Sequence, residues 1–249
     1  LAGILNVVLS PAQDVVSQLL NWLREKEILL VFDNFEHLLD GADLLVDILQ
    51  AAPGVTILAT SRQALDLQAE YIYEVDGLSY PVGTDIVAGS TPYPAMQLFQ
   101  DRAARVRADF ALSDDIAPAV ARICQLVEGI PLAIELAATW VRTESCTTIA
   151  EEIQHNLDFL ATNRRDIAER HRSLRTVFEG SWNLLTETEQ AVLPKLTVFQ
   201  GRFDRHAAEA VAGARTHVIA SLVDKTLLRS DGRGHYDMHE IIRQYAAER

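Results

Sequence analysis

The sequence has little cysteine, glycine and proline, and it has no long apolar run. Its 249 residues include 2 Cys, 12 Gly and 8 Pro, which excludes a disulfide-rich scaffold, a collagen-like chain and a low-complexity chain. No apolar stretch approaches the roughly 18–20 residues of a membrane-spanning helix, and the first residues lack the features of a signal peptide. We therefore expect a cytoplasmic protein with reduced thiols at Cys124 and Cys146 and with no membrane partner.

Positive charge is also scarce. The chain has 22 Lys and Arg against 35 Asp and Glu, a formal net charge of −13, so its overall field repels a nucleic-acid backbone. A local basic run, residues 164–175, holds five arginines against two acids. DNA binding through this run is one interpretation. We prefer a junction between subdomains, because the candidate recognition helix, residues 216–225, is apolar, and nucleic acid is an unlikely partner for this chain.

The first third of the sequence predicts an α/β layer. Two short runs, Ile28–Phe32 and Val55–Ala59, are apolar at nearly every position, which is typical of parallel strands covered on both faces. Helical patterns precede each run, over residues 11–26, with Ser10 and Pro11 as the start signal, and over residues 38–49. The alternating residues 71–75 predict one more strand, before a Gly/Pro/Ser-rich connector.

From about residue 95 the pattern is helical. Apolar stripes predict helices over residues 95–107, 114–128, 132–143 and 149–160, the last with a capping box formed by Thr148 and Glu151. Further helices are expected over 173–185, 187–196, 204–212, 216–225 and 239–248, and Thr186 with Glu189 forms another expected capping box. Two short strands, 227–230 and 235–237, precede the final helix. This order predicts a winged-helix arrangement.

Polar residues follow both predicted strands. Asp33 comes directly after the first strand and Arg62 follows the second, so both are expected at the carboxyl edge of the sheet, where nucleotide-binding folds collect their ligands. Asp33 suits a magnesium site, and Arg62 suits a phosphate sensor. The alternatives are that Asp33 and Asn34 cap the next helix and that Arg62 is a solvated loop residue.

Several segments resemble one known family. They are ILLVFDNFEHLLD (28–40), TILATSR (56–62), EGIPLAIELAA (128–138), residues 170–203, LVDKTLL (222–228) and residues 236–248. Their order and spacing resemble the STAND class of signal-transduction ATPases, also called NB-ARC or apoptotic ATPases and related to AAA+ proteins, particularly members within large bacterial transcriptional regulators. The resemblance covers nearly the entire chain.

The resemblance implies a fold made of three parts. Residues 1–78 would be the C-terminal part of a parallel-sheet, P-loop-type nucleotide-binding domain, and residues 79–94 a linker. Residues 95–163 would form an all-α bundle subdomain, and residues 164–249 a winged-helix subdomain.

It also implies roles for particular residues. Asp33 matches the Walker B acid that holds magnesium, and Arg62 the arginine that reads the γ-phosphate. Pro131, in the motif with Gly129, matches the proline that packs on adenine, although a proline here also starts a helix. His239 matches the histidine that reaches the β-phosphate of ADP. The alternative for His239 is a residue at a helix N-terminus satisfied by local contacts.

One family motif is missing. No Gly-x-x-x-x-Gly-Lys-Ser/Thr sequence occurs in the 249 residues, and the family places this phosphate loop, the Walker A motif, further before the Walker B strand than the chain extends. We therefore expect a fragment that binds ATP, ADP and magnesium poorly and is inactive as an ATPase alone.

The favoured function is a nucleotide-binding oligomerisation and switch module of a signalling or transcription-regulatory ATPase. It would be closed with ADP and open with ATP, act on its own flanking sensor and effector domains, and form a homo-oligomer when active. The alternatives are a winged-helix DNA-binding transcriptional regulator and a nucleotide-free protein-interaction scaffold.

Overall fold

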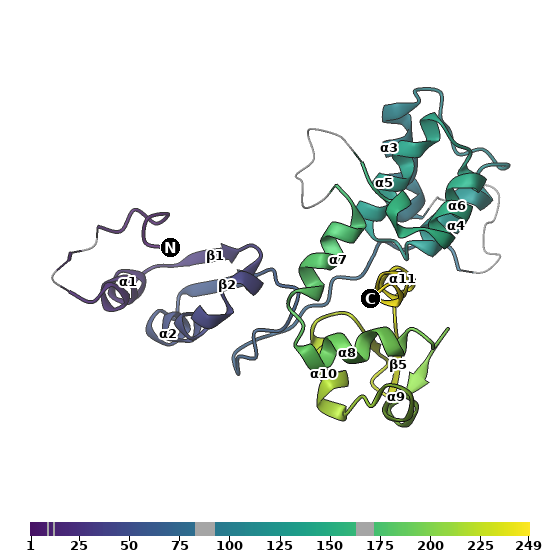
Figure 1. The fold of residues 1–249 in the computed structure, drawn as a ribbon. Helices are drawn as coiled ribbons and strands as arrows, with labels where there is room; N and C mark the ends of the chain where they lie inside the picture. Colours follow the sequence, from purple (N-terminus) through teal and green to yellow (C-terminus); the bar gives the residue numbers. More distant parts are fainter. Residues whose placement is uncertain (9, 12, 83–92, 163–171) are drawn as a thin grey trace. The chain divides into compact units, whose positions relative to one another are not determined.

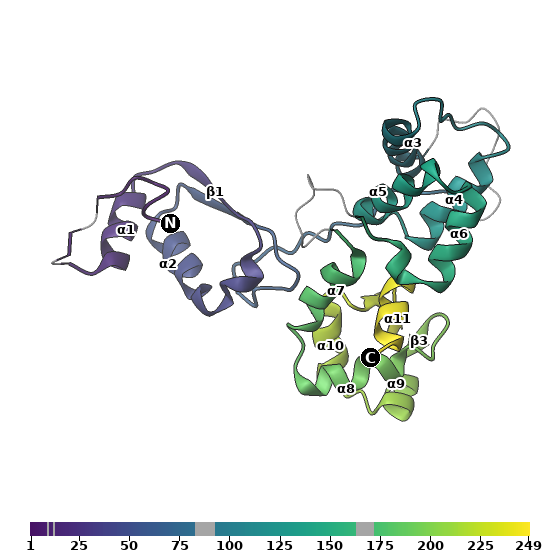
Figure 2. The same ribbon diagram turned by 45° about the horizontal axis from the view of Figure 1, so that its top comes forward.

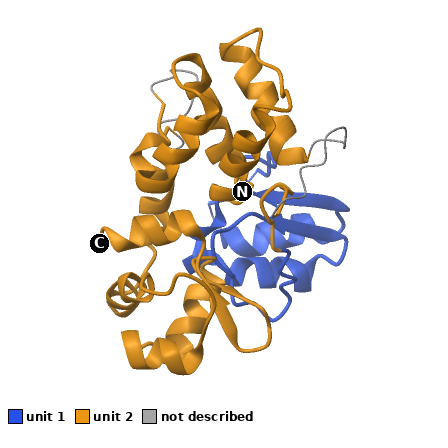
Figure 3. Ribbon diagram, turned by 90° about the vertical axis from the view of Figure 1, so that its right-hand side faces the viewer, with its two compact units in different colours: residues 1–73 blue, residues 74–249 orange. Residues whose placement is uncertain are grey.

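The computed structural model describes residues 1–8, 10, 11, 13–82, 93–162 and 172–249. The chain divides into two compact units, Leu1–Tyr73 and Glu74–Arg249, which Figure 3 colours separately. Most of the basic run 164–175 and most of the predicted connector before residue 95 lie outside the described residues. Within the described residues, no helix is both long and apolar enough to cross a membrane.

Unit 1 is a small α/β layer. Strand β1 (Ile28–Phe32) pairs in parallel with β2 (Val55–Ala59), and helices α1 (Val15–Leu23) and α2 (Asp43–Ala51) accompany the sheet. One core joins Leu19 and Leu23 of α1 to Leu30, Ile48 and Val55. The parallel pair and the helix before each strand are confirmed. Between β1 and α2 the chain makes two 3-10 turns, η1 (Phe35–His37) and η2 (Leu39–Gly41), and η2 takes the place of the first turn of the helix expected over residues 38–49.

Three sequence predictions for unit 1 are wrong. Helix α1 begins at Val15, because the Asp14 carboxylate accepts the backbone N–H of Ser17 over 2.8 Å and replaces Ser10 as the cap. Residues 71–75 form no strand; Tyr71 is 98% exposed, and none of the described strands pairs with this segment. The sheet is not covered on both faces either, since Leu29, Val31 and Leu58 are exposed.

Unit 2 begins with a helical bundle. It consists of α3 (Pro94–Val106), α4 (Ala117–Leu126), α5 (Pro131–Thr139), η3 (Trp140–Arg142), α6 (Cys146–His155) and η4 (Leu157–Phe159). Fully buried side chains such as Phe99, Ile123 and Ile134 form its core. The predicted capping box at Thr148 is wrong, because Ser145 caps α6 by accepting the Thr148 backbone N–H. Both cysteines are buried and free.

The second core of unit 2 belongs to a C-terminal lobe, residues 185–249. Its elements are α8 (Glu187–Leu196), β3 (Phe203–Asp204), α9 (Arg205–Ala212), α10 (Thr216–Asp224), β4 (Arg229–Ser230), β5 (His235–Asp237) and α11 (Glu240–Ala247). The three strands form one antiparallel sheet in the order β3-β5-β4. The hairpin is confirmed, whereas β3 was not predicted because two residues carry no periodicity. The capping box of Thr186 and Glu189 is formed.

Helix α11 joins the two cores of unit 2. Its residues Ile241 and Tyr245 pack in the bundle core, while Ile242 and Ala246 pack in the lobe core. Helix α7 (Leu174–Trp182) makes a similar link, since Phe178 and Trp182 border both cores. Figures 1 and 2 show α11, in yellow, between the bundle helices and α8 to α10.

Candidate functional site

The carboxyl ends of β1 and β2 meet in unit 1. Phe32 and Ala59 are in register, so the residues that follow them, Asp33 and Thr60, lie side by side. The Thr60 hydroxyl donates to Asp33 Oδ1 over 2.7 Å, and Thr60 Oγ1 accepts the backbone N–H of Asn34 over 3.0 Å. Two strand ends are thereby tied together around an exposed carboxylate.

The structure disfavours helix capping as the role of this pair. Asn34 precedes the first 3-10 turn in the left-handed region, with φ of 60°, and its side chain forms no capping bond. The second 3-10 turn follows Leu38, whose apolar side chain cannot cap it. Helix α2 also begins without a side-chain cap. The Asp33 carboxylate therefore remains at the sheet edge, fixed by Thr60, whose contribution was not recognised in the sequence.

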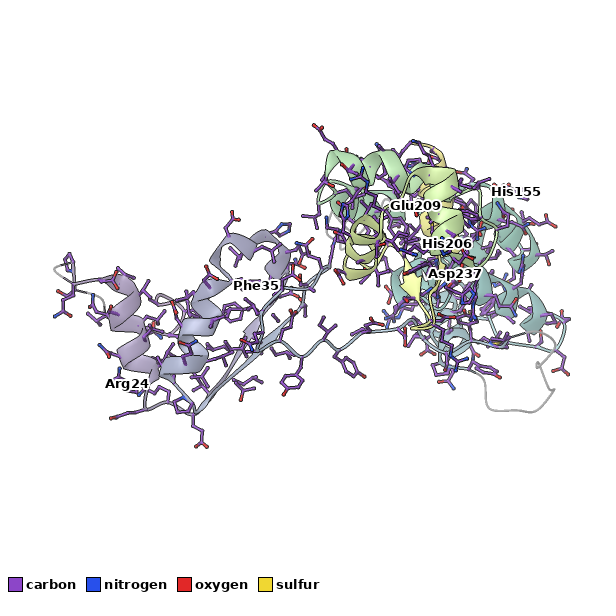
Figure 4. The ribbon with its side chains drawn as sticks, turned by 90° about the horizontal axis from the view of Figure 1, so that it is seen from below. Arg24, Phe35, His155, His206, Glu209 and Asp237 are labelled. Carbon is purple, nitrogen blue, oxygen red and sulfur yellow. The ribbon has the colours of Figure 1, made fainter. Side chains whose placement is uncertain are left out.

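Arg62 lies in the same unit and pairs with a buried carboxylate. Its Nε is 3.3 Å from Glu36 Oε1, and the Glu36 side chain is only 2% exposed. Glu36 Oε2 has no hydrogen-bond partner among the described residues. Next to it, Phe35 is buried edge-on against Phe32 and donates its backbone N–H to Thr60 O; Figure 4 labels Phe35 in this unit. Arg62 is thus ion-paired with a buried carboxylate while part of its side chain stays exposed.

Gly129 and Pro131 lie in the turn between α4 and α5 of unit 2. Pro131 is the first residue of α5, as a helix-starting proline should be, and it is exposed. Gly129 has φ of 72°, and a Cβ there would lie 2.0 Å from the Leu78 carbonyl oxygen. Only glycine fits this close backbone approach, in which Leu78 donates its N–H to Gly129 O over 2.8 Å.

His239 precedes α11 and is not satisfied by local contacts. Its side chain forms no capping bond, is 13% exposed, and has Nδ1 without a hydrogen-bond partner among the described residues. Nδ1 lies 3.4 Å from Glu128 Oε1, in the turn that leads to Pro131. Burial lowers the pKa of His239 to about 4, and the Arg229 charge adds to this effect while Glu128 opposes it. The imidazole is therefore neutral at pH 7.

A polar cavity of about 440 Å³ opens beside Glu128 in unit 2. Its lining includes Tyr80 and, from the hairpin, Arg229, Asp231 and Asp237; Figure 4 labels Asp237. The charges are paired within the protein, because Arg229 contacts both Glu128 (2.6 Å) and Asp237 (3.5 Å). The cavity wall is therefore a network of ion pairs and not a concentration of one charge.

The structure thus forms two groups of the predicted residues. Asp33 and Arg62 lie on the loops after β1 and β2 of unit 1, and Gly129, Pro131 and His239 are connected through Glu128 in unit 2. The oxygens of Asp33 and Thr60 suit Mg²⁺, which takes one or two protein ligands beside water and phosphate. Glu36 and Glu128 were missed, because nothing in their sequence neighbourhood reveals contacts with Arg62 and His239.

Comparisons with known proteins find relatives among bacterial regulators. The chain is 38% identical over 250 residues to a protein of Mycobacterium tuberculosis named as an HTH-type transcriptional regulator, with 96% of the chain and 27% of the relative covered. It is 34% identical to an uncharacterized protein of the same organism, with 98% of the chain and 63% of the relative covered. No family model matches the chain. The chain therefore corresponds to about a quarter of the named regulator.

Comparison with solved structures finds a chain that shares this fold. The Walker-type ATPase of Pyrococcus abyssi matches with a TM-score of 0.57 at 13% identity, covering 96% of the chain and 70% of that protein. A STAND protein with a tetratricopeptide repeat sensor from Pyrococcus horikoshii also matches, with a TM-score of 0.32 at 14% identity, covering 94% of the chain and 30% of that protein. The first match shows a shared fold, mixed α/β and rich in helix.

Proposed function

We propose that this chain is part of the nucleotide-binding switch module of a regulatory ATPase of the STAND type. The observation that carries the proposal is the Asp33 carboxylate, held by Thr60 at the carboxyl edge of a parallel sheet. The Walker-type fold and the relatives named as transcriptional regulators support it at a coarser level. The activity of the intact protein would then be nucleotide-dependent control of flanking domains.

In unit 1 we assign metal and phosphate recognition. Asp33 would supply an oxygen ligand to the Mg²⁺ of a nucleotide, and the bound ion would neutralise charge on the β- and γ-phosphates. Arg62 would read the γ-phosphate as a planar donor. Because Arg62 already pairs with Glu36, we propose that phosphate and Glu36 share its five N–H donors.

In unit 2 we assign recognition of adenine and of the β-phosphate. The exposed Pro131, presented by the tight turn at Gly129, would pack against the base. His239 is neutral at pH 7 and retains one ring N–H that can donate to a phosphate oxygen of ADP. ADP contacts with His239 would favour a closed packing, and exchange for ATP would favour an open form that oligomerises.

The first experiment measures the nucleotide content of the full-length protein. It would be purified without added nucleotide, denatured, and the released nucleotide quantified by ion-exchange chromatography. We expect close to one ADP per chain. Asp33→Asn should weaken the Mg²⁺ dependence of ATP binding at least tenfold, and Asp40→Asn, which changes another exposed aspartate after the same strand, should not. No bound nucleotide, together with no ADP or ATP binding on titration, would favour the scaffold alternative.

DNA binding by the C-terminal lobe is the second candidate, because relatives carry an HTH regulator name. Helix α10 presents few side chains that could read DNA bases. Val218, Ile219 and Leu222 are buried in the lobe core. The exposed positions of the helix are Thr216, His217, Ala220 and Asp224. We therefore place any DNA contact of the full-length protein elsewhere. Salt-dependent duplex binding by the 249-residue chain would reverse this assignment.

A further inference from the structure

Glu128 is one side chain of the bundle that contacts three groups of the C-terminal lobe. Its Oε1 accepts the backbone N–H of Glu240 over 3.1 Å and lies 3.4 Å from His239 Nδ1. Its Oε2 is 2.6 Å from Arg229 Nη2. The side chain is 16% exposed, so these contacts are shielded from most of the solvent.

The contact with Glu240 supplies what α11 lacks. His239, the residue before this helix, forms no side-chain capping bond, so the first N–H groups of α11 need another acceptor. Glu128 provides a carboxylate to the first turn from 112 residues away in sequence. A negative charge at this end of a helix is stabilised by the helix dipole as well as by the hydrogen bond.

The backbone at Glu128 is held in a tight left-handed turn by close packing of its neighbours. Glu128 has φ of 46°, a left-handed conformation that costs a glutamate more than it costs glycine or asparagine. The next residue, Gly129, is also left-handed and packs against Leu78. On the other side, a Cβ on Gly77 would lie 2.3 Å from the Glu128 carbonyl oxygen. The strained turn thus aims the carboxylate at the lobe.

We propose that Glu128 is a positioning residue for His239: its carboxylate holds the start of α11 and the hairpin residue Arg229 on the bundle, and its loss releases this end of the helix. This role of Glu128 needs no bound nucleotide and is separate from nucleotide recognition. Other charged groups around His239 are Arg229 and Asp237 of the hairpin, and Tyr80 lies near Glu128 and Arg229. Of these groups, Glu128 is the one that contacts the hairpin through Arg229 and the first turn of α11 through the Glu240 N–H.

A competing explanation is that apolar packing alone docks α11. On this explanation the burial of Ile241 and Tyr245 in the bundle core holds α11 in place without the Glu128 carboxylate. The two explanations predict opposite shifts of the His239 pKa when the carboxylate is removed. If α11 is released, His239 meets water and its pKa rises toward the ordinary value of about 6.5. If α11 stays docked, burial together with the remaining Arg229 charge keeps the pKa at about 4 or below.

The test is an NMR pH titration of the His239 ring in the 249-residue chain, with hydrogen exchange of the Glu240 amide measured in parallel. For Glu128→Ala we expect a pKa rise of at least one unit and amide exchange at least ten times faster. Glu128→Gly should behave alike, although it relieves the positive φ, because the carboxylate is the active group. An unchanged or lower pKa with unchanged exchange in these variants would overturn the proposal.

Two further variants keep the test decisive. Glu128→Gln preserves shape and one acceptor while it removes the charge; we expect Glu240 exchange at least three times faster, and unchanged exchange would also overturn the proposal even if the alanine variant failed to fold. Glu209→Ala removes an exposed glutamate of α9, which Figure 4 labels, and serves as the matched control with no expected change. Failure of nucleotide binding in the full-length protein would leave these measurements unaffected, so the two proposals fail separately.

Discussion

Thr60 donates its hydroxyl proton to Asp33 across the carboxyl ends of the two parallel strands, with 2.7 Å between the oxygens. The same hydroxyl oxygen accepts the backbone N–H of Asn34, so one threonine orients the candidate magnesium ligand and the left-handed residue after it. The site geometry in unit 1 therefore depends on a residue that carries no charge.

Replacing Thr60 should loosen this strand end. Thr60→Val keeps the shape and removes both hydrogen bonds, which contribute about 1 kcal/mol together at this exposed position. Thr60→Ser should retain them. We expect faster hydrogen exchange of the Asn34 and Phe35 amides in the valine variant only. Equal exchange in both variants would show that the hydroxyl does not order the loop.

Removing Arg62 alone should destabilise unit 1 more than removing Arg62 together with the charge of its partner, Glu36. Arg62→Ala leaves the buried Glu36 carboxylate without its cation, at a cost of about 2 kcal/mol, reduced from a fully buried pair because Arg62 is 33% exposed. Adding Glu36→Gln should restore most of the loss. A urea-unfolding double-mutant cycle measures the coupling, and additive effects of the two changes would contradict a direct pair.

Glu189 should be a main determinant of stability in the C-terminal lobe. It is 3% exposed, accepts the Thr186 backbone N–H as part of the capping box, and accepts bonds from Ser221 and from Lys225 over 2.7 Å. Burial raises its pKa, but these bonds outweigh burial and lower it overall. Glu189→Ala should cost about 3 kcal/mol in urea unfolding. The neighbouring exposed Glu187→Ala should cost far less, and equal losses would refute this role.

Acid should weaken unit 2 through His239. Its folded pKa of about 4 lies below the unfolded value of about 6.5, so the neutral ring contributes stability fully above pH 6.5, and this contribution is lost as the pH falls toward 4. The shift corresponds to about 3 kcal/mol as an upper bound. His239→Gln should remove this part of the pH dependence. Urea unfolding at pH 7 and pH 4.5 measures this loss. An equal fall in the free energy of unfolding in both proteins would exclude the contribution of His239.

The sequence predicted those features that depend on neighbouring residues. The capping box of Thr186 and Glu189, the parallel pair of apolar strands and most helices follow from local patterns, and they are present. Start signals were misplaced where two capping residues compete, as with Ser10 and Asp14. The strand predicted at residues 71–75 is absent because a strand needs a neighbour to pair with. An alternating apolar and polar pattern does not show whether such a neighbour exists.

The candidate site was predicted in part for the same reason. Asp33 and Arg62 follow strands, so their common edge could be expected from the parallel arrangement. The partners that fix the site, Glu36 and Glu128, act through a buried ion pair and through a contact across 112 residues. Neither is encoded by spacing, and Glu128 also adopts a positive φ that its sequence does not favour.

The most direct measurement of the proposed switch is calorimetric titration of the full-length protein with ADP and with ATP, before and after His239→Ala. In the proposed switch only the closed form uses the imidazole, so loss of this phosphate contact should weaken ADP binding at least tenfold and ATP binding much less. Equal ADP affinity in the two proteins would contradict the assignment of His239 and with it the nucleotide-dependent closure of the lobe.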